Sequence, residues 1–224
     1  MAYLTSYVTR VNLSATMVEI NKVGLALKTT TALALTVCSV TYGAGQVISG
    51  WLCDRYKPHN LILLGFSVTA YVNLLVGVMP QESWLVPLWG INGFAQAMMW
   101  PPMVRILSAA LEEEDYRRAC VRVSWGSSVG TMLVYLAAPL IIQVLNVRWV
   151  FYACAAAAVA MLVFWKLAYD GNFEPVTPAV RQTQTASGVP MGSLAAALMA
   201  AVFFGIVLQG SLRDGVTIWM PSYV

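Results

Sequence analysis

Charge is scarce in this sequence of 224 residues. Only 10% of the residues are charged, against 59% that are hydrophobic, and the mean hydropathy of +0.69 is far above that of soluble globular domains. The 13 basic and 10 acidic residues give a net charge of +3 and are scattered along the chain. This composition excludes an ordinary soluble domain. Because the basic residues form no continuous face, it also predicts no nucleic-acid partner.

Catalytic and metal-binding patterns are also missing. The single histidine, His59, has no partner nucleophile, and the sequence contains no glycine-rich phosphate loop. The four cysteines fall in or beside apolar runs without metal-ligand spacing, and they are too far apart to indicate a disulfide scaffold. We therefore expect no enzyme activity, no cofactor and no metal. A retinal-type receptor is excluded as well, because the last apolar segment has no lysine that could form a Schiff base.

Long apolar segments are what the sequence has in abundance. About 20 helical residues cross a bilayer core of about 30 Å, and seven segments come close to that length. They lie at 1–18, 31–52, 60–80, 84–107, 121–143, 147–168 and 191–220. Their apolar residues do not alternate with polar ones as in a membrane barrel, and backbone groups in lipid must be paired internally. The sequence therefore predicts an all-α, polytopic bundle of membrane helices.

The polar segments divide the chain unevenly. We expect a six-helix bundle over 1–168, a cytoplasmic linker over 169–190 that is rich in proline and threonine, and the first helix of a second bundle over 191–224. Lysine and arginine residues gather at alternate ends of the spans in the way that places the N-terminus in the cytoplasm. The expected location is a plasma membrane, the inner membrane of a bacterium, with the lipid bilayer as a partner.

A polar stripe runs along the first segment. Tyr3, Tyr7, Arg10 and Ser14 are spaced so that they share one face of a helix. An arginine inside a membrane span costs at least about 2.5 kcal/mol on insertion scales, so its presence indicates a water-filled cavity or an anionic partner. The alternative is that Arg10 extends to the cytoplasmic interface and has no ligand.

Three other places could carry a site or only packing. The prolines Pro101 and Pro102 must interrupt the hydrogen bonds of the fourth segment, which forms either a cavity wall or a simple kink. The small residues over 126–130 indicate a close helix contact. In the last segment Arg213 and Asp214 are adjacent and point about 100° apart on a helix, so one of them faces a cavity unless Arg213 lies at the outer interface.

Together these patterns resemble the organophosphate:phosphate antiporter family of the major facilitator superfamily, and its glycerol-3-phosphate transporter branch in particular. A more general superfamily element, Gly50-x-x-x-Asp54-Arg55, accompanies three specific motifs. These are Asn92-Gly93-x-x-Gln96-x-x-x-Trp100-Pro101-Pro102-x-x-Arg105, Tyr3-x-x-x-Tyr7-x-x-Arg10-x-Asn12, and Leu212-Arg213-x-Gly215 followed by Trp219-x-Pro221-x-Tyr223.

The resemblance implies a secondary transporter that works by alternating access, with a substrate cavity between two six-helix halves. Arg10 and Arg213 would bind the phosphate group of a small anionic substrate, either an organophosphate or inorganic phosphate. Other residues of the cavity would be Tyr3, Tyr7, Tyr42, Gln46, Gln96, Trp100 and Ser127. A cytoplasmic gate would consist of Asp54, Arg55 and Arg105.

The sequence departs from that branch at three points. Gln46 stands where the branch has a lysine, Ser127 stands where it has a histidine, and about seven helices are present where the family has about twelve. The substitutions leave open which phosphoester or other organic anion is bound. The length implies either a fragment of a longer transporter, which we favour, or helices supplied by a second chain. A membrane sensor of a phosphorylated ligand and a non-functional fragment are the alternatives to a transporter.

Overall fold

The computed structural model describes residues 1–79 and 81–172, and beyond them only the single positions 198, 201, 204, 205, 208, 212, 215 and 216. The chain separates into two compact units, Met1–Pro178 and Ala179–Val224. The few described positions of the second unit are helical. Most of the predicted linker and of the seventh segment, including Arg213, lies outside the described residues.

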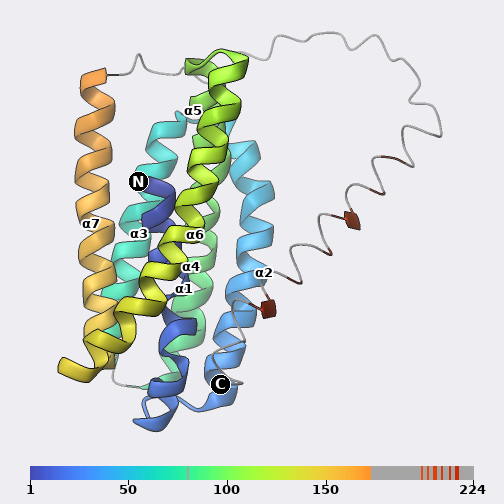
Figure 1. Ribbon diagram of the computed structural model, residues 1–224. Helices are drawn as coiled ribbons and strands as arrows, with labels where there is room; N and C mark the ends of the chain where they lie inside the picture. The colour runs from blue at the N-terminus through green and yellow to red at the C-terminus, as the bar shows by residue number, and fades with distance from the viewer. Residues whose placement is uncertain are drawn as a thin grey trace. The chain divides into compact units, whose positions relative to one another are not determined.

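Seven α-helices and one 3-10 turn make up the described part of the first unit (Figure 1). They are α1 (Ala2–Lys22), α2 (Lys28–Cys53), α3 (Pro58–Val78), η1 (Glu82–Trp84), α4 (Leu85–Ala97), α5 (Trp100–Ala110), α6 (Glu113–Val144) and α7 (Val147–Asn172). No strand occurs among the described residues, and four of these helices, α2, α3, α6 and α7, are long and apolar enough to cross a membrane. The predicted all-α membrane bundle is confirmed.

Proline, glycine and one carboxylate set several of the helix ends. Pro58 begins α3, where a missing N–H costs nothing. The turn after α1 contains Gly24 with a φ of 73°, a backbone conformation that side chains other than glycine's rarely allow. At the start of α2, a carboxylate oxygen of Glu82 accepts a hydrogen bond of 2.6 Å from the backbone N–H of Leu27. This contact ties the turn before α2 to the turn before α4.

The fourth apolar segment is two helices rather than one. Helix α4 ends at Ala97 and α5 begins at Trp100, directly before Pro101 and Pro102. The two prolines remove the N–H groups that would otherwise bond to the carbonyls of Ala97 and Met98. The predicted interruption of the helix is therefore confirmed.

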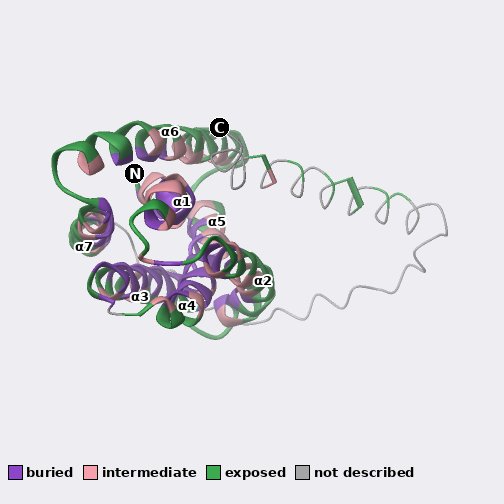
Figure 2. Ribbon diagram, turned by 90° about the horizontal axis from the view of Figure 1, so that it is seen from below, coloured by how far each residue is buried: buried purple, intermediate pink, exposed green. Residues whose placement is uncertain are grey.

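Helix α1 occupies the middle of the unit. It packs against α6 and α7, while α2 packs against α4, and α3 packs against both α7 and α4. In the view along the helices, α1 lies between α6 on one side and α3, α4 and α2 on the other (Figure 2). Polar as well as apolar residues of α1 are consequently buried, among them Thr9, Asn12 and Thr16.

The outer helices carry large apolar side chains on their exposed faces. Val47 of α2 is 77% exposed, and Trp125 and Leu136 of α6 are 72% and 66% exposed. A protein in water rarely leaves so many large apolar residues uncovered. Lipid, by contrast, solvates such faces, so their exposure agrees with the membrane environment indicated by the composition.

Candidate functional site

An aromatic cluster surrounds the guanidinium group of Arg10, which is half-buried near the middle of α1. Its Cζ atom lies 3.8 Å from the centroid of the Tyr42 ring of α2 and 5.7 Å from that of Tyr7. Tyr3 contacts Tyr7 at a centroid distance of 5.2 Å and the ring of Trp100 at 5.0 Å. The structure thus brings together five of the predicted site residues, from α1, α2 and α5.

The physical effect of this cluster is to stabilise a cation without neutralising it. Aromatic faces attract a guanidinium group through their quadrupoles, with about 0.5–2 kcal/mol for each well-placed ring. Because the rings carry no net charge, the positive charge of Arg10 is retained. A guanidinium group carries paired N–H donors whose geometry matches the oxygens of a phosphate or carboxylate.

Two further predicted residues, Gln46 and Ser127, differ in their surroundings. Gln46 lies one turn after Tyr42 on α2, and its buried Nε2 atom has no hydrogen-bond partner within the described part of the chain. It is therefore a free donor on the face of α2 that carries Tyr42. The Ser127 hydroxyl instead donates to the backbone oxygen of Ser124 at 2.6 Å, within α6.

The small residues at 126–130 form the predicted close helix contact. A Cβ atom added at Gly130 would lie 2.5 Å from the backbone oxygen of Leu4 in α1, and one at Gly126 would lie 3.5 Å from the backbone nitrogen of the same residue. Larger side chains at Gly130 would push α6 away from α1. The interpretation of this segment as a packing motif is confirmed.

Gln96 is buried inside the bundle. Its Nε2 atom donates to the Thr9 hydroxyl at 2.9 Å and to the Thr69 hydroxyl at 3.3 Å, and its Oε1 atom accepts a hydrogen bond from the hydroxyl of Ser6. All these partners belong to α1 and α3. The structure therefore places Gln96 at the junction of three helices, with its amide group already occupied by bundle contacts.

Gln96 is part of a larger group of hydrogen-bonded side chains that we call the polar seam. Every member is at least 97% buried, and each lies on α1, α3 or α4. The members are Ser6, Thr9, Asn12, Thr69, Asn73, Asn92 and Gln96. The helical patterns in the sequence did not predict Ser6, Thr9, Thr69 or Asn73 as members of a site. The one available signal was a pair of polar residues one turn apart, Thr69 and Asn73, within the very apolar third segment.

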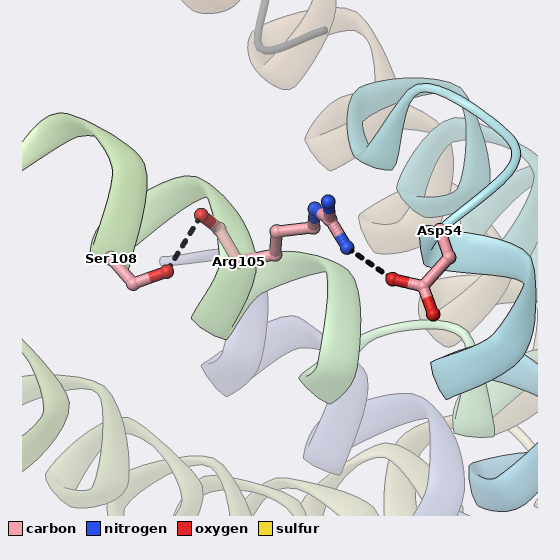
Figure 3. Close-up of polar contacts among 3 residues, drawn as sticks. All are labelled: Asp54, Arg105 and Ser108. Carbon is pink, nitrogen blue, oxygen red and sulfur yellow. Dashed lines mark hydrogen bonds and ion pairs between the residues drawn. The ribbon is translucent and has the colours of Figure 1, made fainter. Parts of the chain in front are cut away.

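Two of the three residues predicted to form a cytoplasmic gate contact each other. The Nη1 atom of Arg105 in α5 lies 2.7 Å from Oδ1 of Asp54, directly after α2 (Figure 3). The hydroxyl of Ser108 donates to the backbone oxygen of Arg105 at 3.0 Å, one turn along α5. Arg55 does not share this contact, because its guanidinium group lies 3.9 Å from the centroid of the Trp51 ring. The ion pair therefore joins Asp54 to Arg105, and Arg55 stacks against Trp51 of the preceding helix α2.

Curated relatives of this chain include named transport proteins for phosphorylated compounds and a membrane sensor protein. The chain is 33% identical over 69 residues to a probable hexose phosphate transport protein of Chlamydia trachomatis. The aligned segment covers 31% of this chain and 15% of that relative. It is 24% identical over 173 residues to the membrane sensor protein UhpC of Escherichia coli, 75% of this chain and 38% of the relative. A glycerol-3-phosphate transporter of Bacillus subtilis is 30% identical over 112 residues, 48% of this chain and 25% of the relative.

Solved structures show the same fold. A peptide transporter named POT superposes with a TM-score of 0.67 at 18% identity, over 96% of this chain and 46% of the transporter. The chain thus spans less than half the length of these proteins. The sequence profile of the Major Facilitator Superfamily matches residues 1–224. The resemblance drawn from the motifs is confirmed, and the chain belongs to the Major Facilitator Superfamily.

Proposed function

We propose that this chain supplies one half of the substrate path of a secondary transporter, which exchanges an organophosphate or a related organic anion for inorganic phosphate. The observation that carries this proposal is the position of Arg10. Arg10 lies on α1, the central helix of the unit, and the Cζ atom of its guanidinium group is 3.8 Å from the centroid of the Tyr42 ring. A permanent positive charge inside a membrane bundle is costly, and binding an anionic substrate compensates for that cost.

In this proposal each residue of the cluster has a separate task. Arg10 binds the phosphate oxygens through paired N–H donors. Tyr42 and Tyr7 keep the guanidinium group oriented while they leave its charge intact. Gln46 adds a neutral donor where the glycerol-3-phosphate branch has a lysine, so this half of the site carries one positive charge fewer than that branch.

The second anion-binding group in this proposal is Arg213, in the segment of this chain that would begin the other half of the transporter. Two arginines match the charge of a phosphate dianion better than one. The rest of the second half is either a continuation of the same polypeptide or a complementary chain. The N-terminus lies on the cytoplasmic side of the plasma membrane, so that Asp54 and Arg105 close the inner end of the path.

A sensor is the second candidate function, and a specific similarity favours it. The aligned part of the membrane sensor protein UhpC covers 75% of this chain, more than either aligned transporter covers. A sensor would bind a phosphorylated ligand at the same arginine without completing an exchange cycle. The two functions therefore share the site and differ only in the movement that follows binding.

The experiment that tests the proposal is exchange of labelled inorganic phosphate in proteoliposomes that contain the chain together with its second half. Substitution of Arg10→Lys keeps the charge and removes the forked donors, so we expect phosphate affinity to fall by about 10- to 100-fold. The matched control is Arg118→Lys, because Arg118 is an exposed arginine paired with Glu114 on α6. Equal exchange by all three proteins would refute the proposal. Binding of labelled phosphate without exchange would support the sensor.

A further inference from the structure

We propose that the polar seam sets the rotation of α1 and thereby aims Arg10 at its ligand, with Asn73, Asn92 and Gln96 as positioning residues. The inference rests on the proposed function for its purpose, but its geometry stands on contacts within the bundle. None of the three amides needs to touch the substrate. They act on the helix that carries Arg10.

Several hydrogen bonds of the polar seam end on Thr9, the residue directly before Arg10. The backbone oxygen of Thr9 accepts from Nδ2 of Asn92 at 3.3 Å and from Nδ2 of Asn73 at 3.5 Å. The hydroxyl of Thr9 accepts from Nε2 of Gln96 at 2.9 Å. Three amide side chains, from α3 and α4, thus converge on one residue of α1.

A second attachment lies one turn further along. Nδ2 of Asn12 donates to Oδ1 of Asn73 at 2.7 Å, and Oδ1 of Asn12 accepts from the backbone N–H of Leu13 at 3.0 Å. Asn73 also donates to the backbone oxygen of Thr69 at 2.9 Å, which fixes its own rotamer. The attachment points on α1 therefore lie on both sides of Arg10 in sequence.

The directions of these side chains explain the effect on Arg10. Successive residues of an α-helix are about 100° apart, so the faces of Thr9 and Asn12 differ from the face of Arg10 by about 100° and about 160°. The seam holds α1 from the side of α3 and α4, and Arg10 is directed toward Tyr42 of α2. A rotation of α1 that moved Arg10 away from Tyr42 would break several buried hydrogen bonds at once.

Apolar residues would hold α1 in place less specifically. Helices that pack through small and apolar side chains can shift or rotate at low cost, whereas a buried hydrogen-bond network has one satisfied arrangement. Replacing both partners of a buried hydrogen bond by apolar groups of the same shape is often nearly neutral for stability. Packing alone therefore gives no reason for seven buried polar residues between these helices. Orientation of α1 gives one, because hydrogen bonds depend on direction.

The test is a cross-linking measurement that needs no ligand. Arg10→Cys and Tyr42→Cys are introduced in a background without the four native cysteines, and the rate of cross-linking by a short bifunctional thiol reagent is measured in membranes. We expect Asn73→Leu to lower this rate about tenfold, because the helix is no longer held in one rotation. If Asn73→Leu does not reach the membrane, Asn92→Leu removes one bond to the Thr9 oxygen and gives the same readout.

The matched control is Thr16→Val. Thr16 is fully buried on the same helix, but its hydroxyl donates only to the backbone oxygens of Asn12 at 2.8 Å and Leu13 at 3.3 Å within α1. We expect the Thr16→Val variant to cross-link at the same rate as the protein with an intact polar seam. An unchanged rate in the Asn73 or Asn92 variant, or an equal fall in Thr16→Val, overturns the inference.

Binding of labelled inorganic phosphate separates this inference from the proposed function. If the chain with an intact Arg10 and seam binds phosphate, we expect Asn73→Leu to weaken binding about tenfold, and to have little further effect once Arg10→Lys is present. If that chain does not bind phosphate, the proposed function fails, and the cross-linking rates alone decide whether the seam orients α1.

Discussion

The Nη1 atom of Arg105 lies 2.7 Å from the Oδ1 atom of Asp54, and this ion pair connects α5 with the end of α2. Asp54 is 69% exposed at its side chain and Arg105 is 21% exposed. Trp100, five residues before Arg105 on the same short helix, contacts Tyr3 of the aromatic cluster. The short helix α5 therefore carries both a residue of the proposed gate and a residue of the aromatic cluster around Arg10.

Breaking this ion pair should change the accessibility of the site more than the stability of the bundle. An exposed pair contributes about 0.2–1 kcal/mol, which corresponds to at most about a fivefold change in the balance between two conformations. We expect Asp54→Asn to raise the rate at which a thiol reagent on the cytoplasmic side labels Trp100→Cys by up to about fivefold. The measurement is maleimide labelling in inside-out vesicles without the native cysteines.

A second ion pair in the chain offers the control for the proposed gate. Glu114 and Arg118 are 2.6 Å apart within α6, and both are well exposed. Glu114→Gln removes this pair without touching α2 or α5, so the labelling rate should stay the same. The charge exchange Asp54→Arg with Arg105→Asp should bring the rate back toward the original value. A labelling rate that rises equally in Glu114→Gln would contradict a gating role.

Gly93 is a position where an added methyl group should destabilise the bundle. A Cβ atom there would collide with the backbone oxygen of Cys38 and would lie 2.5 Å from the Thr41 hydroxyl. Because backbone atoms cannot move aside, Gly93→Ala should lower the free energy of unfolding by about 1–3 kcal/mol. The control is Gly43→Ala, because nothing lies within 4 Å of a Cβ atom at Gly43. Thermal melting in detergent compares the two, and equal melting temperatures would refute the contact.

The Tyr42 ring should matter for anion binding more than the Tyr42 hydroxyl. A cation over an aromatic face is stabilised by about 0.5–2 kcal/mol, and here the ring holds Arg10 in place. We expect Tyr42→Phe to retain phosphate affinity to within a few-fold and Tyr42→Leu to lose about 3- to 30-fold. Equilibrium binding of labelled phosphate measures both. If the two variants bind phosphate equally well, the ring does not orient Arg10.

Apolar content predicted the helices well but not all of their ends. The segment at 121–143 marks the membrane part of α6, whereas the helix begins eight residues earlier at Glu113. Acidic residues in the first turn, Glu113, Glu114 and Asp115, interact favourably with the positive end of the helix dipole. Such a polar extension has no apolar signal, so hydropathy cannot detect it.

Helical spacing predicted which site residues lie together only when those residues belong to the same helix. The spacing of Tyr3, Tyr7 and Arg10 placed them on one face, and the structure brings them together. The direction of Gln96 could not be predicted, because periodicity does not reveal which neighbouring helix a face meets. The donor Asn73 was missed for the same reason, since its partners Thr9 and Asn12 are more than 60 residues away in sequence.

The break between α4 and α5 should be needed for movement and not for folding. Replacing Pro101→Ala and Pro102→Ala together restores N–H donors for the carbonyls of Ala97 and Met98, so the two helices can join. We expect a higher melting temperature, slower hydrogen exchange around 98–101 and slower cytoplasmic labelling of Trp100→Cys. The control is Pro87→Ala, because Pro87 lies in the first turn of α4, where its N–H is not needed. A labelling rate that matches the control, despite slower hydrogen exchange, would show that the break does not serve the gate.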